Sequence, residues 1–88
     1  MQIVFTKQFV KQVSKTNDKQ LAREVETLIL EVKNATDLSE INGLKQLKGS
    51  IKAYRIRLGD YRIGIYNTND IIEFSCFMHR KEIYRYFP

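Results

Sequence analysis

The sequence predicts an α+β fold in which a strand, a helical hairpin and a three-stranded antiparallel meander are followed by a short C-terminal helical element. Two patterns predict it. Apolar residues in the first half recur every three or four positions, as on one face of a helix, whereas apolar and polar residues alternate in the second half, as along a strand. The 88 residues suffice for one domain, so we expect residues 1–88 to fold as one unit, with the two helices packed on one face of the sheet.

The first half begins with a strand at residues 2–5, followed by two helices. Thr6 is a typical N-cap for the first helix, and Asn17 or Asp18 for the second. The apolar positions are Phe9, Val10 and Val13 in the first helix, and Leu21, Ala22, Val25, Leu28, Ile29 and Val32 in the second. Each set forms one stripe, so each helix has one face to bury.

The meander is predicted from residues 51–58, 61–66 and 71–78. Gly59-Asp60 is a two-residue turn signal, and residues 67–70 form a second turn. The third segment is apolar at nearly every position, which is typical of an interior strand.

Two further segments are less regular. Residues 35–50 are predicted to be a polar connection with one helical turn, and residues 79–87 a helical turn or two. In that last element Ile83 and Phe87 would share the anchoring face.

Composition excludes several classes of protein. With 43% hydrophobic residues the chain is too apolar for disorder, yet its apolar runs are too short to span a bilayer. The start of the chain lacks the pattern of a secretory signal, and one cysteine forms no internal disulfide. No cysteine or histidine cluster has zinc spacing, and the dispersed acidic residues do not predict a magnesium site. We therefore expect a cytoplasmic protein with no membrane contact, no metal and no cofactor.

The positive charge is concentrated in the second half. Residues 1–44 contain six basic and six acidic side chains, whereas residues 45–88 contain nine basic and four acidic ones. The whole net charge of +5 thus lies in the second half, which indicates an anionic partner there.

The two-residue turn fixes which side chains face each other across the hairpin. It places Arg57 opposite Arg62, and Arg55 opposite Gly64, where a missing side chain would leave room for a ligand backbone. Like charges directly opposed are destabilising, so the pair suggests a phosphate site. The alternative is a passive, solvated sheet face. Three lysines precede the hairpin and would extend the positive surface: Lys45, Lys48 and Lys52.

The C-terminal segment adds groups suited to RNA. His79, Arg80 and Tyr84 together could move a proton, hold a phosphate and stack on a base. The structural alternatives are a surface or core histidine at a strand end, and packing of Tyr84 and Tyr86 against the sheet.

Three runs of this sequence resemble the RelE/ParE superfamily of type II toxin–antitoxin toxins: Leu47-Lys48-Gly49, then Tyr54-Arg55-Ile56-Arg57-Leu58-Gly59-Asp60-Tyr61-Arg62-Ile63, then His79-Arg80-Lys81-Glu82-Ile83-Tyr84. The resemblance covers nearly the whole chain. It implies a metal-independent endoribonuclease that cuts mRNA on the ribosome and is neutralised by an antitoxin. The alternatives within the superfamily are a ParE-like inhibitor of DNA gyrase and an inactive relative that only binds its antitoxin.

The resemblance also implies roles for individual residues. Arg57, Arg62, His79, Arg80 and Tyr84 would form the catalytic set, and Lys45, Lys48, Lys52 and Arg55 would bind RNA. The antitoxin would cover the helical hairpin or the sheet, or displace the C-terminal element. Candidate antitoxin contacts are the stripe of residues 21–32 and the face formed by Ile83 and Phe87.

Overall fold

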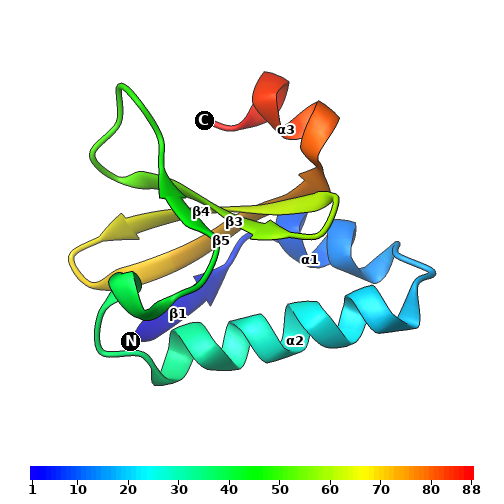
Figure 1. Ribbon diagram of the computed structural model, residues 1–88, viewed down its shortest axis with the longest axis horizontal. Coiled ribbons are helices and arrows are strands. Elements are labelled where there is room, and N and C mark those ends of the chain that lie inside the picture. The colour runs from blue at the N-terminus through cyan, green and yellow to red at the C-terminus, as the bar shows by residue number, and fades with distance from the viewer.

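The structure, a computed structural model, describes residues 1–88 (Figure 1). Its elements are β1 (Gln2–Phe5), α1 (Lys7–Ser14), α2 (Lys19–Asn34), a 3-10 turn η1 (Leu38–Glu40), β2 (Leu44–Gln46), β3 (Ala53–Leu58), β4 (Tyr61–Thr68), β5 (Ile71–His79) and α3 (Arg80–Tyr86). The strands form one sheet in the order β1-β5-β4-β3-β2. This confirms the α+β prediction and the interior position of β5.

Both long helices start at the predicted caps. The side chain of Thr6 accepts a hydrogen bond from the Phe9 N–H at 3.0 Å, and that of Asp18 accepts one from the Leu21 N–H at 3.1 Å. Each bond satisfies a backbone donor that lacks a partner in the first turn of a helix. Asp18, rather than Asn17, is therefore the cap of α2.

The main core lies between the two long helices and one face of the sheet. The α2 stripe contributes Leu21, Val25, Leu28 and Val32, all buried. The sheet contributes Ile56, Ile63, Ile65, Ile72 and Phe74, all inaccessible to solvent. In α1, Phe9 is buried as predicted, but Val10 is 55% exposed because it points away from the sheet.

The connection between α2 and β3 is more structured than predicted. Besides η1, it contains the edge strand β2, which pairs antiparallel with β3. Four of its residues are buried: Ala35, Leu38, Ile41 and Leu47. A strand of three residues has too short an alternation to be recognised in sequence.

The predicted hairpin register is confirmed. Leu58 pairs with Tyr61, and Arg57 pairs with Arg62. The second turn is tighter than predicted, since β4 runs to Thr68 and only Asn69 and Asp70 remain outside the strands. Both have positive φ, +52° and +64°, as a type I′ hairpin turn requires.

The C-terminal helix packs on the face of the sheet opposite α1 and α2. Figure 1 shows α3 on one side of the sheet and the two longer helices on the other. A second buried cluster holds α3 in place: Leu47, Ala53, Cys76, Ile83 and Phe87. The predicted anchoring face of Ile83 and Phe87 is thus confirmed. The fold has a third, partial layer over the sheet face that carries the hairpin arginines.

Candidate nucleic-acid interface

Cationic side chains line a hollow on the sheet face beside α3. We call it the cationic hollow; its volume is about 210 Å³ and its lining residues are Gly43, Lys45, Arg55, Arg57, Arg62 and Tyr84. Four of the six are cationic and none is acidic. A hollow with this lining is suited to a phosphate-containing ligand.

Strand alternation places these side chains on one face. Tyr54, Ile56 and Leu58 of β3 pack toward the helices, so Arg55 and Arg57 project to the other side. Lys45 of β2 pairs with Arg55, which brings a third cation alongside. The hairpin itself therefore builds the charge cluster.

The two opposed arginines differ in their surroundings. Arg62 donates hydrogen bonds from Nη1 to the carbonyl oxygens of Gly59 and Tyr61, both at 2.8 Å. Arg57 is exposed and also borders a second groove, which is lined in part by Glu24 and Glu31 of α2. The hairpin turn thus fixes Arg62, whereas Arg57 lies between the cationic hollow and an acidic helix face.

Tyr84 closes one side of the cationic hollow. The guanidinium carbon of Arg55 lies 4.4 Å from the centroid of the Tyr84 ring, a cation–π contact. The Tyr84 side chain is 63% exposed, so its ring contacts Arg55 without being buried in the core. Packing alone, the alternative considered for Tyr84, does not describe it.

The space above Gly64 is not open to a ligand. A Cβ built on Gly64 would meet the Phe87 ring at 2.7 Å and the Cys76 sulfur at 2.7 Å. The predicted gap for a ligand backbone is therefore wrong, because Phe87 from the chain end fills it. The ligand-accessible part of this face is restricted to the cationic hollow and its surroundings.

Three other predicted residues lie outside the hollow. Lys48 and Lys52 are exposed in the loop between β2 and β3. Arg80 is exposed at the start of α3, where its N–H donates to the carbonyl of Asp60 at 2.8 Å. The backbone of Arg80 is thus bonded to the same hairpin turn that holds the Arg62 side chain.

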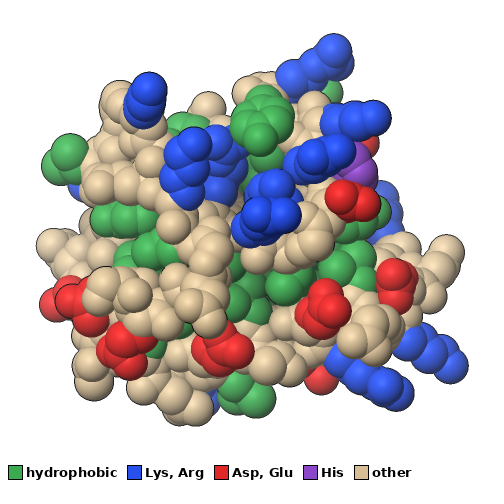
Figure 2. Space-filling model, viewed as in Figure 1, with side chains coloured by type: hydrophobic (Ala, Val, Ile, Leu, Met, Phe, Trp, Pro, Cys, Tyr) green, Lys and Arg blue, Asp and Glu red, His purple; other side chains and the backbone are tan.

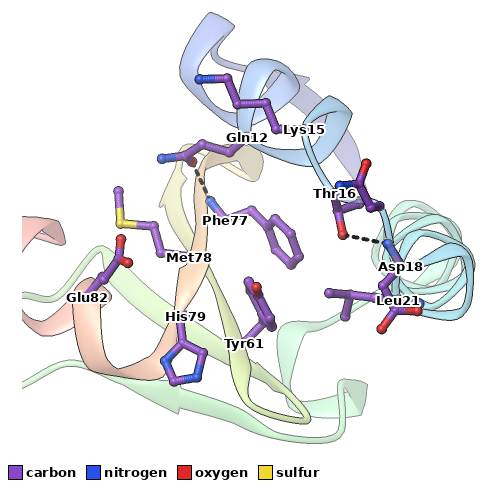
Figure 3. A pocket seen from close by; sticks show the side chains of 11 residues that line it. Gln12, Lys15, Thr16, Asp18, Leu21, Tyr61, Phe77, Met78, His79 and Glu82 are labelled. Carbon is purple, nitrogen blue, oxygen red and sulfur yellow. Dashed lines mark hydrogen bonds between the residues drawn. The ribbon is translucent and has the colours of Figure 1, made fainter.

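His79 lines a different hollow. As Figure 3 shows, this one is bordered by α1, the start of α2 and the end of β5, and its volume is about 490 Å³. The His79 ring packs edge-on against Tyr61 at 5.5 Å, and its Nδ1 accepts a hydrogen bond from the Lys81 N–H at 3.1 Å. The structure thus makes His79 the N-cap of α3 and does not bring it together with Arg57, Arg62 and Tyr84.

The predicted antitoxin contacts are already used within the molecule. Leu21, Val25, Leu28 and Val32 are in the main core, and Ile83 and Phe87 are buried against the sheet. Packing within the molecule, the alternative reading of these residues, therefore accounts for most of them in the free chain, and an antitoxin that displaces α3 would expose Ile83 and Phe87. Among the large hydrophobic side chains, the exposed ones are Val4, Phe5, Val10, Leu30, Ile51, Ile71, Tyr84 and Tyr86.

Two sequence signals had been missed. Gly43 approaches the backbone of β3 closely: its carbonyl accepts from the Arg57 N–H at 3.0 Å, and a Cβ there would lie 3.2 Å from the Arg57 carbonyl oxygen. Its positive φ of +79° also favours glycine. The second is the contact of Phe87 with Gly64: the anchoring role of Phe87 was predicted, but not that its ring would pack on this glycine.

Charge is separated over the surface. In Figure 2, a cluster of Lys and Arg side chains covers the region where Figure 1 has β3, β4 and α3, while acidic side chains lie mostly on the α2 side. No three His, Cys, Asp or Glu side chains gather as a metal site would require. None of the helices combines the length and apolar character needed to cross a membrane.

Known proteins are similar to this chain in sequence and in fold. A curated protein, Toxin RelE3 of Methanocaldococcus jannaschii, is 39% identical over 89 residues, covering 100% of both chains. The chain belongs to the RelE family of toxins. No family model matches it.

Solved RelE structures have the same architecture. In the RelB-RelE antitoxin-toxin complex from Methanococcus jannaschii, one chain is 37% identical to this RelE-family chain with a TM-score of 0.79, over 97% of this chain and 99% of that one. The intact E. coli RelBE toxin-antitoxin complex contains a chain 15% identical with a TM-score of 0.70, over 89% and 94% of the two chains. The second match concerns the fold alone.

Proposed function

We propose that this RelE-family toxin is a metal-independent endoribonuclease that cleaves mRNA on the ribosome. The observation that carries the proposal is the cationic hollow, where four cations meet without a carboxylate. In the proposed reaction the ribose 2′-OH attacks the adjacent phosphorus, and the bond from phosphorus to the 5′-oxygen breaks. The products are a 2′,3′-cyclic phosphate and a 5′-OH, with the 2′-OH proton lost to a base and the leaving oxygen protonated.

The arginines supply charge where the transition state needs it. The phosphorane carries more negative charge than the ground-state phosphate, and fixed cations that meet it lower the barrier. Arg62 is already oriented by two carbonyl groups, so little reorganisation is needed when charge develops. Arg57 would approach the same phosphate from β3, the strand opposite Arg62. Arg55 and Lys45 would hold the neighbouring phosphates of the RNA backbone.

Tyr84 and Arg80 complete the proposed site from α3. The exposed Tyr84 ring, with Arg55 at 4.4 Å, offers a surface on which a base can stack. The backbone N–H of Arg80 is bonded to the Asp60 carbonyl, in the turn that holds Arg62. The Arg80 side chain would add positive charge at the rim of the cationic hollow. His79, the remaining member of the predicted catalytic set, lines the other hollow.

The proposed partners follow from the family and the charge. Two of the solved relatives are toxin–antitoxin complexes of RelE with RelB, and we propose that an antitoxin also neutralises this chain. An acidic antitoxin segment would be attracted to the cationic hollow and compete with RNA there. Lys48 and Lys52 are exposed and would add contacts to RNA or the ribosome. Because the proposed target is translated mRNA, we propose that the toxin acts in the cytoplasm.

Expression in cells tests the proposal. Wild type should arrest growth and produce new 5′ ends inside open reading frames, detected by primer extension on translated mRNA, and Arg62→Ala should do neither. Arrest with a DNA-damage response and intact mRNA would instead indicate gyrase inhibition. Absence of arrest by the wild type would indicate an inactive relative.

A further inference from the structure

The end of the chain rests directly on the backbone of β4. A Cβ on Gly64 would lie 2.7 and 2.8 Å from two carbons of the Phe87 ring, closer than real side chains approach. Any residue larger than glycine would therefore have to displace the Phe87 ring or the Cys76 sulfur next to it. The Phe87 ring thus packs directly on Gly64. We call the space above Gly64 the seat, and the Phe87 ring that fills it an anchor of α3.

The anchor is well packed on its other sides. The Phe87 ring is 6% exposed, and its centroid lies 5.0 Å from that of Tyr66. Ile83, one turn earlier, is inaccessible to solvent, and its carbonyl accepts from the Phe87 N–H at 2.9 Å. The two anchors thus hold the last turn of α3 against the sheet.

Tyr84 lies between the two anchors but is not itself anchored. It is 63% exposed, and its ring contacts the Arg55 guanidinium. A helix of seven residues is too short to be stable alone in water, so the position of Tyr84 depends on tertiary contacts of its neighbours. Phe87 and Ile83 provide those contacts.

We infer that Phe87 is a positioning residue for the cationic hollow, because its seat on Gly64 holds the Tyr84 ring at the hollow. The functional part of this inference rests on the proposed RNA cleavage. Phe87 itself does not line the hollow, so it acts on RNA only through Tyr84. Loss of the seat should therefore have the same consequence as loss of the tyrosine ring.

An NMR experiment on the full chain tests the geometry without any RNA. A ring current from Tyr84 should shift the side-chain protons of Arg55 upfield in the wild type. The shift should disappear in Tyr84→Ala, Phe87→Ala and Gly64→Ala, and remain in the control Tyr86→Ala, which alters an exposed residue of the same helix. A Phe87→Ala protein that keeps the shift overturns the inference, whether or not the wild type cleaves RNA.

A double-mutant cycle tests the function. Tyr84→Ala should slow mRNA cleavage on purified ribosomes by about tenfold to a hundredfold, as expected for a lost stacking contact. Phe87→Ala should cause a similar loss, and the double variant should lose no more than either single variant. Losses that multiply would show that Phe87 acts independently of Tyr84, and would overturn the inference.

Two controls separate the possible failures. Phe87→Leu refills most of the seat and should recover both the Arg55 shift and most of the cleavage rate, which a simple folding defect in Phe87→Ala would not explain. If the wild type cleaves no mRNA while the NMR shifts follow the expected pattern, the proposed function is wrong and the positioning geometry stands. If Phe87→Leu behaves like Phe87→Ala in both assays, the anchoring argument is wrong.

Discussion

Arg57 and Arg62 are directly opposed across the hairpin of β3 and β4, and both line the cationic hollow. The Arg62 guanidinium is tied to two turn carbonyls, while Arg57 is exposed beside the acidic side of α2. Two cations in register oppose folding and favour an anionic ligand.

Removing one member of the pair should not destabilise the fold. Arg57→Thr relieves like-charge repulsion and introduces a residue with good strand propensity, so the free energy of unfolding should stay the same or rise by up to about 0.5 kcal/mol. Urea unfolding of the two proteins measures this. A loss of more than about 1 kcal/mol would mean that Arg57 has a structural partner within the chain.

RNA binding should depend steeply on salt. If the four cations of the hollow each neutralise one phosphate, the logarithm of the binding constant for a short single-stranded RNA should fall with the logarithm of salt concentration with a slope of about −3. Fluorescence titrations at several salt concentrations give the slope, and Lys45→Ala should reduce its magnitude. A flat response would remove the electrostatic basis of the proposed site.

The Cys76 thiol should be inert in the native protein. Burial raises the pKa of Cys76 from 9.0 to about 11, and the thiolate is the reactive form. Alkylation at pH 8 should therefore be much slower than in denaturant, and faster in Phe87→Ala, where the cover of the sulfur is removed. Rapid alkylation of the wild type would show that the end of the chain is not docked.

The same pKa shift makes stability depend on alkaline pH. The folded-state pKa of Cys76 lies above the unfolded value, so its contribution is complete below about pH 9 and is lost as pH rises toward 11. Cys76→Ala should remove this component, which urea unfolding between pH 8 and 11 would detect. An identical pH dependence in both proteins would contradict the assignment.

His79 should act mainly as the cap of α3. His79→Ala removes the acceptor of the Lys81 N–H and should cost about 1 kcal/mol of unfolding free energy, whereas His79→Asn can still cap and should restore most of it. Because His79 lies outside the cationic hollow, His79→Asn should cleave mRNA nearly as fast as the wild type. A large loss of cleavage in a stable His79→Asn protein would place the imidazole in the catalytic set.

Much of the fold could be predicted because its signals are local. The caps Thr6 and Asp18, the stripe of α2 and the Gly59-Asp60 turn each depend on residues adjacent in the chain. The turn alone fixes the register, and with it the opposition of Arg57 and Arg62. Strand β2 could not be predicted, because a strand of three residues is too short to show a periodic pattern.

Other features depend on contacts between segments that are distant in the sequence. Gly64 was expected to leave room for a ligand, yet Phe87 from the chain end fills the space. His79 is predicted to belong to the catalytic set; strand alternation turns it toward Tyr61 and the helices, so its catalytic role stays a prediction that the His79→Asn variant tests. The α2 stripe, a candidate antitoxin contact, packs in the core of the free chain. A single sequence shows which side chains can be buried, but not which partner buries them.

The cleavage rate of mRNA on purified ribosomes tests the central proposal most directly, with Arg62→Ala compared with Lys11→Ala, an exposed lysine of α1 away from the hollow. Loss of a fixed cation that meets the transition state should slow cleavage by about a hundredfold to a thousandfold. Lys11→Ala should match the wild type. Equal rates for the wild type and Arg62→Ala would contradict the proposal that the opposed arginines carry the chemistry.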